Sequence, residues 1–412
     1  MSAVEVDPSG FYRASSLEMA TGWVSGRTTI PRPEPPEAHE HPRRAMERLL
    51  LPALQQRPCV VGFSGGRDSS AVLAVAVDLA RREGLDPPVP VTNVYPELDE
   101  TDETRWQELV IRHLGLDEWV RQEFTDETDL LSPTSIASLR RHGPLWPATI
   151  HNREPLISVA RGGCYIDGEG GDEVLGDFRL TPLVRILTGD LQIGTRAAKE
   201  LVKTLGPKRV RRHLARRSMR YNRTLRPWLK PEANEWFIST SAAESTDVPL
   251  AYGPAILRFL GHRGVQACFG NLDRMGAHLG VQYVHPLLDP GFALALAQFG
   301  PRWGHAGRTA TMRAVFRDLL PEELLSRPTK VFFNRAYAHR HTREFVEHWD
   351  GTGLDPELID AEELLRAWQH PLFPGGSFQL VHLAWLATHA GERSGDRAPT
   401  DVDPTPTAAN AS

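Results

Sequence analysis

The sequence predicts an α/β fold in which a parallel sheet is flanked by helices and followed by a mostly helical C-terminal lobe. Two observations predict this class. Short apolar, β-rich runs alternate with helical segments in the first half of the chain, and such alternation is typical of parallel sheets. From about residue 185 onward, apolar residues recur at helical spacing, for example at Leu201, Leu205, Val210 and Leu214.

The first predicted elements form a helix–strand–helix–strand succession. Residues 45–54 have the pattern of a helix. Cys59–Phe63 is short, β-rich and bounded by a proline and by glycines, so we expect a buried strand there. After the next helix, a second strand is expected over Val89–Tyr95. The order of these elements supports a parallel sheet.

A glycine-rich turn, SGGRDSS at residues 64–70, joins the first strand to a helix expected over Ser69–Leu79, with Ser64 or Asp68 as its cap. Free backbone N–H groups and the helix dipole favour an anion at such a place, so the turn predicts a phosphate site. A carboxylate at Asp68 fits this site if Mg²⁺ bridges it to phosphate oxygens, because this cation prefers oxygen ligands of both kinds.

A second turn, DGEGGDE at residues 167–173, follows the apolar segment Gly163–Ile166. It holds four acidic residues among three glycines. These carboxylates repel each other unless a cation or a cationic substrate lies among them. Because parallel sheets bind ligands beyond the carboxyl ends of their strands, we expect the two turns to form two walls of one site.

These motifs carry a family resemblance. SGGRDSS resembles the pyrophosphate loop of the N-type ATP pyrophosphatases and lacks the Gly-Lys-Ser/Thr ending of a Walker A loop. With DGEGGDEVLGDF at 167–178, the chain resembles the synthetase domain of asparagine synthetase and its β-lactam synthetase and lasso-peptide cyclase relatives. NLDRMGAHLGVQYVHPLLDP at 271–290 and LLPEELLSRPTKVFFN at 319–334 also resemble this family, so the likeness spans about residues 45–385.

The resemblance implies an adenine nucleotide α-hydrolase-like fold and an ATP- and Mg²⁺-dependent ligase that forms amides, with natural-product or peptide biosynthesis as one setting. A carboxylate would attack ATP to give an acyl-adenylate and pyrophosphate, and ammonia or another amine would then displace AMP. Asp68 and Asp172 would bind Mg²⁺. Glu169 would face the incoming amine, and Lys330 would stabilise the transferring phosphates. The residues implied for ATP binding are Ser64, Gly65, Gly66, Asp68, Ser69 and Gly168.

The chain departs from the family pattern at two places in the synthetase region. Asp167 stands where the family usually has Ser or Thr, and Gln282-Tyr283-Val284 stands where it usually has Glu-x-Arg. Both differences weigh against asparagine as the product. Ser2 stands where asparagine synthetases have the cysteine of a glutaminase domain, and only about 45 residues precede the first core helix, so no built-in glutaminase is expected.

The composition predicts four segments. They are a short N-terminal segment with a proline-rich linker (1–44), an ATP-pyrophosphatase core (45–185), a helical lobe completing the synthetase domain (186–390) and a disordered tail (391–412). No stretch approaches the ~18 consecutive apolar residues of a membrane span, and the start lacks the pattern of a signal peptide, so we expect a cytoplasmic protein. Three cysteines without a Cys-x-x-Cys pair predict free thiols.

One stretch, Lys203–Lys230, has eleven Lys or Arg and no acidic residue in a chain of net charge −5. It predicts either a docking surface for an acidic partner, such as a separate amidotransferase or a peptide-binding protein, or a solvated helical face paired with the acids at 97–103. RNA is a further ligand that such a stretch attracts.

Two other functions share part of the pattern. A tRNA-modifying ATP pyrophosphatase would share the first turn, but it does not explain DGEGGDE, and nucleic acid is therefore the less favoured partner. A non-catalytic ATP-binding subunit would fit the departures at Asp167, Gln282 and Val284. The intact acids of the two turns and Lys330 oppose that second alternative.

Overall fold

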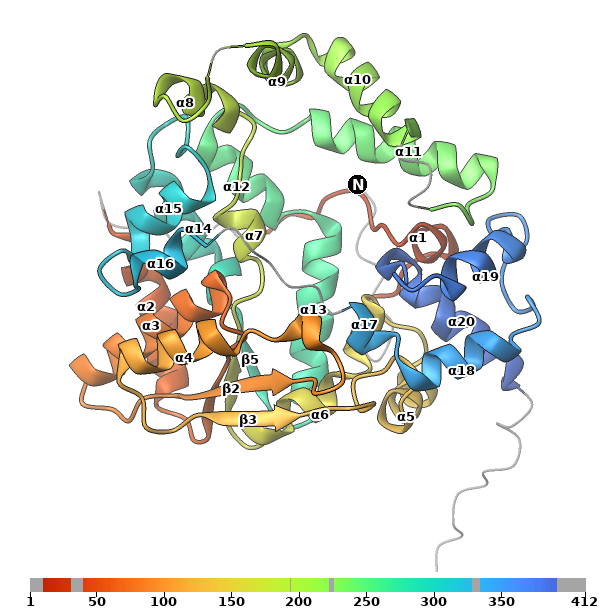
Figure 1. Ribbon diagram of the computed structural model, residues 1–412, viewed down its shortest axis with the longest axis horizontal. Coiled ribbons are helices and arrows are strands. Elements are labelled where there is room, and N and C mark those ends of the chain that lie inside the picture. Colours follow the sequence, from red (N-terminus) through yellow and green to blue (C-terminus); the bar gives the residue numbers. More distant parts are fainter. Residues whose placement is uncertain (1–9, 31–39, 193, 222–225, 328–333, 391–412) are drawn as a thin grey trace, which may run out of the picture.

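The fold is built on a five-stranded sheet whose strands all run parallel (Figure 1). The strands are β1 (Cys59–Gly62), β2 (Val89–Val94), β3 (Val120–Glu123), β4 (Cys164–Ile166) and β5 (Gln282–Val284), in the spatial order β3-β2-β1-β4-β5. The computed structural model describes residues 10–30, 40–192, 194–221, 226–327 and 334–390. The predicted α/β class with a parallel sheet is confirmed.

Helices cover both faces of the sheet, which explains why β1 is apolar at successive positions. Cys59 and Val61 pack in the core formed with α2 (Pro42–Leu54) and α3 (Arg67–Arg82). Val60 points to the opposite face and packs with α6 (Arg153–Ile157) and α13 (Arg263–His278). Successive side chains of a strand alternate between faces, so one short apolar run serves two cores.

The remaining helices complete the first core and build a second one. With α2 and α3, the first core includes side chains of α4 (Thr104–Leu114), α7 (Gly171–Val174), α12 (Tyr252–Leu260), α14 (Pro290–Phe299), α15 (Arg308–Phe316) and α16 (Glu322–Leu325). Around four buried tryptophans, the other core joins α1 (Ser16–Thr21), α5 (Pro133–His142), α11 (Pro231–Thr246), α18 (Arg340–His348), α19 (Ala361–Gln369) and α20 (Phe378–Thr388). α17 (Asn334–Tyr337) lies between the sheet and this second core (Figure 1).

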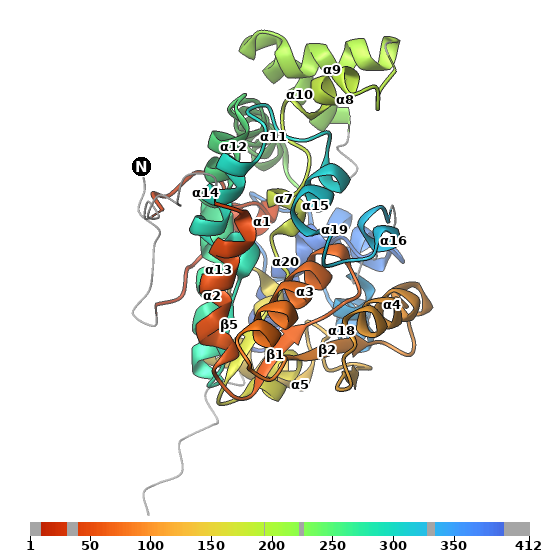
Figure 2. The same ribbon diagram turned by 90° about the vertical axis from the view of Figure 1, so that its left-hand side faces the viewer.

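Three helices lie at one end of the molecule: α8 (Thr181–Leu187), α9 (Thr195–Leu205) and α10 (Lys208–Tyr221). The basic stretch begins in the last turn of α9 and includes all of α10, and these two helices project from the same end in both views (Figures 1 and 2). α10 packs along α11. None of the described helices is long and apolar enough to cross a membrane.

Two local features differ from the sequence expectations. β5 lies in the region expected to be helical and adds a strand beside β4, with Tyr165 in register with Tyr283. A three-residue strand is too short to show an alternating pattern, so no local signal predicted it. The predicted cap of α3 by Ser64 or Asp68 is wrong, because the helix begins at Arg67 after Gly66 without a side-chain cap. All three cysteines are free, as predicted.

Candidate active site

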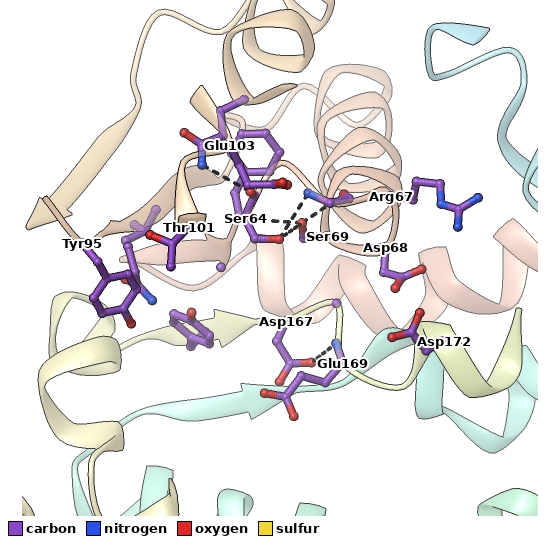
Figure 3. Close-up of a pocket in the computed structure, with 18 of the residues that line it drawn as sticks. Ser64, Arg67, Asp68, Ser69, Tyr95, Thr101, Glu103, Asp167, Glu169 and Asp172 are labelled. Atoms are coloured by element: carbon purple, nitrogen blue, oxygen red, sulfur yellow. Dashed lines mark hydrogen bonds between the residues drawn. The ribbon is translucent and has the colours of Figure 1, made fainter. Parts of the chain in front are cut away.

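The two glycine-rich turns follow β1 and β4, which are neighbouring parallel strands, and they line one cavity of about 340 Å³ at the carboxyl ends of these strands (Figure 3). Of the residues predicted for the site, those that line the cavity are Ser64, Gly66, Asp68, Ser69, Gly168, Glu169 and Asp172. Gly65 belongs to the same turn, with a φ of 80°. Lys330 lies outside the described residues.

The first turn is held by hydrogen bonds among its own polar groups. The hydroxyl of Ser64 accepts a hydrogen bond from the backbone N–H of Gly66 at 3.2 Å and lies 3.1 Å from the hydroxyl of Ser69. Among the described residues, no side chain caps the N–H groups of the first turn of α3. These N–H groups and the positive end of the helix dipole face the cavity, where they can bind an anion.

Close backbone approach brings the second turn against the first. A Cβ atom at Gly168 would lie 2.6 Å from the backbone nitrogen of Ser69, and one at Gly171 would lie 2.2 Å from the side-chain carbon Cγ of Asp68. Real Cβ atoms essentially never come so near. Glycine is therefore required at both positions for the start of α3 and the loop after β4 to meet.

Asp68 and Asp172 face each other at one end of the cavity (Figure 3), and the guanidinium of Arg308 pairs with both. Nη2 of Arg308 is 2.5 Å from Oδ2 of Asp68. The other oxygen of Asp68, Oδ1, is buried and has no hydrogen-bond partner among the described residues. Burial raises the pKa of Asp68, although Arg308 acts in the opposite direction. The two carboxylates together form a site suited to a cation, and the guanidinium of Arg308 is the cation that occupies it in this structure.

A second arginine fixes the turn after β1. Arg327 forms an ion pair with Glu103, in which both side chains are buried, and its Nη1 donates a 3.2 Å hydrogen bond to the carbonyl oxygen of Gly65. The guanidinium also lies over the ring of Trp106, 4.7 Å from the ring centroid. Arg327 immediately precedes the segment that carries Lys330, and both Arg327 and Tyr337 line the cavity. The flanks of that segment therefore reach the site.

A histidine, His285, contacts the second turn through Asp167. Nδ1 of His285 is 2.8 Å from Oδ2 of Asp167, and its Nε2 is 3.1 Å from Oδ1 of Asp273. The other oxygen of Asp167 accepts a 3.2 Å hydrogen bond from the backbone N–H of Glu169. Burial lowers the pKa of His285, but Asp167 and Asp273 outweigh it and raise this pKa to about 10. The imidazolium thus offsets the charge of Asp167 and holds the turn.

The raised pKa of His285 predicts a pH-dependent stability. Because the folded protein holds this proton more tightly than the unfolded chain, the stabilisation is complete below about pH 6.5 and is lost as the pH rises to about 10. We expect His285→Gln to lower the free energy of unfolding by about 3 kcal/mol at the acidic end and much less at the alkaline end. Urea unfolding across this range measures the difference. His348→Gln, at an exposed position, is the control, and an equal loss by His285→Gln at both ends would contradict the expectation.

Glu169 extends toward the other end of the cavity from Asp68 and Asp172 (Figure 3). Its Oε1 is 3.1 Å from Nη2 of Arg153, the first residue of α6. The Glu169 side chain is 38 % exposed and that of Arg153 is 17 % exposed, so the carboxylate stays accessible from the cavity. The site therefore has a carboxylate pair at one end and a carboxylate–guanidinium pair at the other.

The basic stretch lies outside this cavity. Arg216 and Arg220 of α10 pair with Glu235 of α11, and Lys208 pairs with Asp247. The acids at 97–103 have other partners, since Glu103 pairs with Arg327 and Glu100 with Arg335. The suggested pairing between the basic stretch and those acids is therefore wrong, because the two regions face different neighbours.

Sequence reasoning missed the basic side chains of the site. Arg153 and Arg308 lie in no recognised motif, and His285 and Arg327 lie in family-like stretches that gave these two residues no role. The four side chains come from separate parts of the chain, so only the fold brings them to the acids. One signal was present for His285, because Asp167 departs from the family pattern and a buried extra carboxylate requires a cation nearby.

A family model described as asparagine synthase matches residues 53–387, well over half of the chain. The chain belongs to the asparagine synthase family. This confirms the resemblance inferred from the two turns, and the matched region contains every element of the cavity. Asparagine synthase family membership makes the chain an ATP-dependent ligase of the type that forms carbon–nitrogen bonds. A search of curated proteins finds no match.

Proposed function

We propose that this protein adenylates a carboxylate with ATP and transfers the acyl group to an amine, forming an amide with release of AMP and pyrophosphate. The observation that supports this most strongly is the meeting of the two turns: a helix N-terminus suited to phosphate lies against an acidic loop with a separate carboxylate, Glu169, at its far end. One cavity thus offers groups for the nucleotide and for the amine. Natural-product or peptide biosynthesis is the setting that we propose.

In the first step, an oxygen of the substrate carboxylate attacks the α-phosphorus of ATP, and the bond to pyrophosphate breaks. The N–H groups at the start of α3 and the hydroxyls of Ser64 and Ser69 bind phosphate oxygens, which gain charge in this step. Gly65, Gly66 and Gly168 keep the backbone close enough for this contact. Lys330, assigned from the resemblance, would add a positive charge there.

Asp68 and Asp172, one from each turn, are suited to bind Mg²⁺. Asp68 and Asp172 present carboxylate oxygens on the phosphate side of the cavity, and Oδ1 of Asp68 is buried with no hydrogen-bond partner in the described part of the chain. A cationic group, the guanidinium of Arg308, already lies between the two carboxylates. Two carboxylates combined with substrate phosphates are a usual ligand set for Mg²⁺. When bound, this ion supplies charge stabilisation for the phosphates.

In the second step, the amine nitrogen attacks the acyl carbon, and AMP leaves with the electron pair of the broken carbon–oxygen bond. The attacking amine loses a proton, and we assign this proton to the carboxylate of Glu169. The backbone N–H of Glu169 donates a hydrogen bond to Asp167, and Asp167 is bound by His285. These contacts hold the loop that carries the base in one position. General-base catalysis by such a group contributes about 10²- to 10⁴-fold.

The position of Arg308 predicts that its guanidinium competes with Mg²⁺ for the carboxylates of Asp68 and Asp172. Removal of the guanidinium in Arg308→Gln leaves the buried Asp68 beside Asp172 without this cation, so we expect the free energy of unfolding to fall by about 3 kcal/mol without Mg²⁺. Mg²⁺ alone should raise the melting temperature of the variant more than that of the wild type. Arg185→Gln, which removes a surface partner of Asp177, is the matched control. Equal responses of Arg308→Gln and wild type to Mg²⁺ would argue against a shared cation site.

Docking of a partner protein on the described part of the basic stretch remains a proposal supported by charge. Residues of α10 such as Arg209, Arg212 and Arg217 are exposed, and the net charge of the chain is negative, so this helix is the place where an acidic partner would be attracted. Such a partner would be a separate amidotransferase or a peptide-binding protein.

A substrate screen tests the proposed function. The purified chain is given ATP and Mg²⁺ with aspartate and ammonia, and then with pools of other carboxylates and amines, while AMP and pyrophosphate are measured. We expect equal amounts of the two products, released only in the presence of one class of acid. Binding of ATP without pyrophosphate release from any pool would replace the ligase by a non-catalytic ATP-binding subunit.

A further inference from the structure

Arg153 is a buried cation with unused hydrogen-bonding capacity inside the cavity. Its ion pair with Glu169, 3.1 Å long, joins Nη2 to the carboxylate, while its Nε is buried without a hydrogen-bond partner among the described residues. A guanidinium has five N–H donors, so one carboxylate oxygen at this distance leaves most of them available. The group is aimed into the same space as the proposed general base.

The other groups at this end of the cavity do not supply a second free charge. Tyr95 and Tyr165 are buried, and burial raises the pKa of both, so they stay neutral at neutral pH. Asp167 lines the cavity, but its charge is offset by His285. Among the described residues, Glu169 and Arg153 therefore balance each other and form a neutral pair when no substrate is present.

An amine that enters this end of the cavity changes this balance. If it arrives as an ammonium group and binds Glu169, two cations share one carboxylate. Glu169 must also be released from Arg153 to accept a proton, and a buried arginine that loses its partner is strongly destabilised. A carboxylate carried by the same substrate would restore neutrality and use the free donors of Arg153, in the two-point geometry that guanidinium groups favour.

We propose that the amine acceptor carries a carboxylate of its own, as an α-amino acid does, and that Arg153 is the specificity-determining residue that binds it. The ammonium of the acceptor replaces Arg153 at Glu169, and its carboxylate replaces Glu169 at Arg153. This inference rests on the proposed function, because it takes Glu169 as the group that receives the amine. It makes ammonia the poorer acceptor, since ammonia brings a cation without an anion.

Binding to the full chain tests this assignment without turnover. Calorimetric titration compares each proteinogenic L-amino acid with its primary amide, which keeps the amine and lacks the carboxylate charge. We expect at least one amino acid to bind and its amide to bind about 10- to 100-fold more weakly, the loss that a hydrogen bond to a charged group produces. Arg153→Gln should remove this difference by weakening the amino acid alone, and Arg153→Lys should leave a reduced difference.

Arg161→Gln is the matched control, because Arg161 lies in the same stretch and pairs with the exposed Glu154 at 3.4 Å. This variant should keep the wild-type preference. The assignment is overturned if no amino acid binds at millimolar concentration, if amide and amino acid bind equally to the wild type, or if Arg153→Gln keeps the preference. The wild-type comparison stands even where a variant fails to fold. Should the screen show pyrophosphate release with ammonia as a better acceptor than any amino acid, the ligase would stand and this inference would fall.

Discussion

Replacing Glu169 by Gln is expected to separate the two half-reactions. Amide formation should fall by about 10²- to 10⁴-fold, because the proton of the attacking amine loses its acceptor, whereas formation of the acyl-adenylate should change only a few-fold. Pyrophosphate release in the presence of hydroxylamine measures the first step, since this nucleophile is uncharged at neutral pH and needs no base. Amide formation with the natural amine measures the second step.

The matched control for this variant is Glu173→Gln. Glu173 follows Asp172 in the same loop but lines a different cleft, beside α10 and α11, so its replacement should leave both half-reactions near the wild-type rate. If Glu169→Gln slowed the hydroxylamine reaction as much as amide formation, Glu169 would be acting on adenylation or on the shape of the loop. The assignment of Glu169 as the base would then be wrong.

Removing the charge of Asp68 is expected to stop ATP turnover. Asp68→Asn keeps the shape of the side chain but removes a ligand charge for Mg²⁺ beside the phosphates, so turnover should fall by at least about 100-fold. Asp172→Asn should have the same effect, because both carboxylates face the same cation. Steady-state pyrophosphate release at several Mg²⁺ concentrations measures both variants.

Asp177→Asn controls for the loss of an acid from the same loop. Asp177 pairs with Arg185 at 3.0 Å and lines the cleft beside α10 and α11 rather than the cavity of the two turns, and we expect its variant to keep normal turnover. Asp68→Asn with turnover within a few-fold of the wild type would remove the proposed metal site from the reaction.

The sequence was sufficient for β1, β2 and β4 of the sheet and for the acidic residues of the site, because these features depend on local signals. An apolar run followed by glycines predicted β1 and the turn after it, and the same logic applied to β4. The carboxyl-end rule for parallel strands then predicted that the two turns would meet, which the contact of Gly168 with Ser69 bears out in detail.

The rest depends on long-range packing that leaves no local pattern. Arg308 reaches Asp68 across 240 positions of sequence, and His285 reaches Asp167 across 118. Neither pair has a characteristic spacing. The cap of α3 was mispredicted for a related reason. The hydroxyl of Ser64 could accept a hydrogen bond either from the first turn of the helix or from the backbone of its own loop, and in the folded turn it accepts one from Gly66. The partners of these polar groups are determined by tertiary structure rather than by local secondary-structure propensity.

The adenylation of a carboxylate is the central claim, and oxygen tracing tests it most directly. The acid found in the substrate screen is labelled with ¹⁸O in its carboxylate and converted with ATP, Mg²⁺ and the amine, and the products are examined by mass spectrometry. We predict one labelled oxygen in AMP and none in pyrophosphate, because the carboxylate oxygen bonded to the α-phosphorus leaves with AMP. Label in inorganic phosphate, with ADP as the nucleotide product, would show attack at the γ-phosphorus and contradict the account.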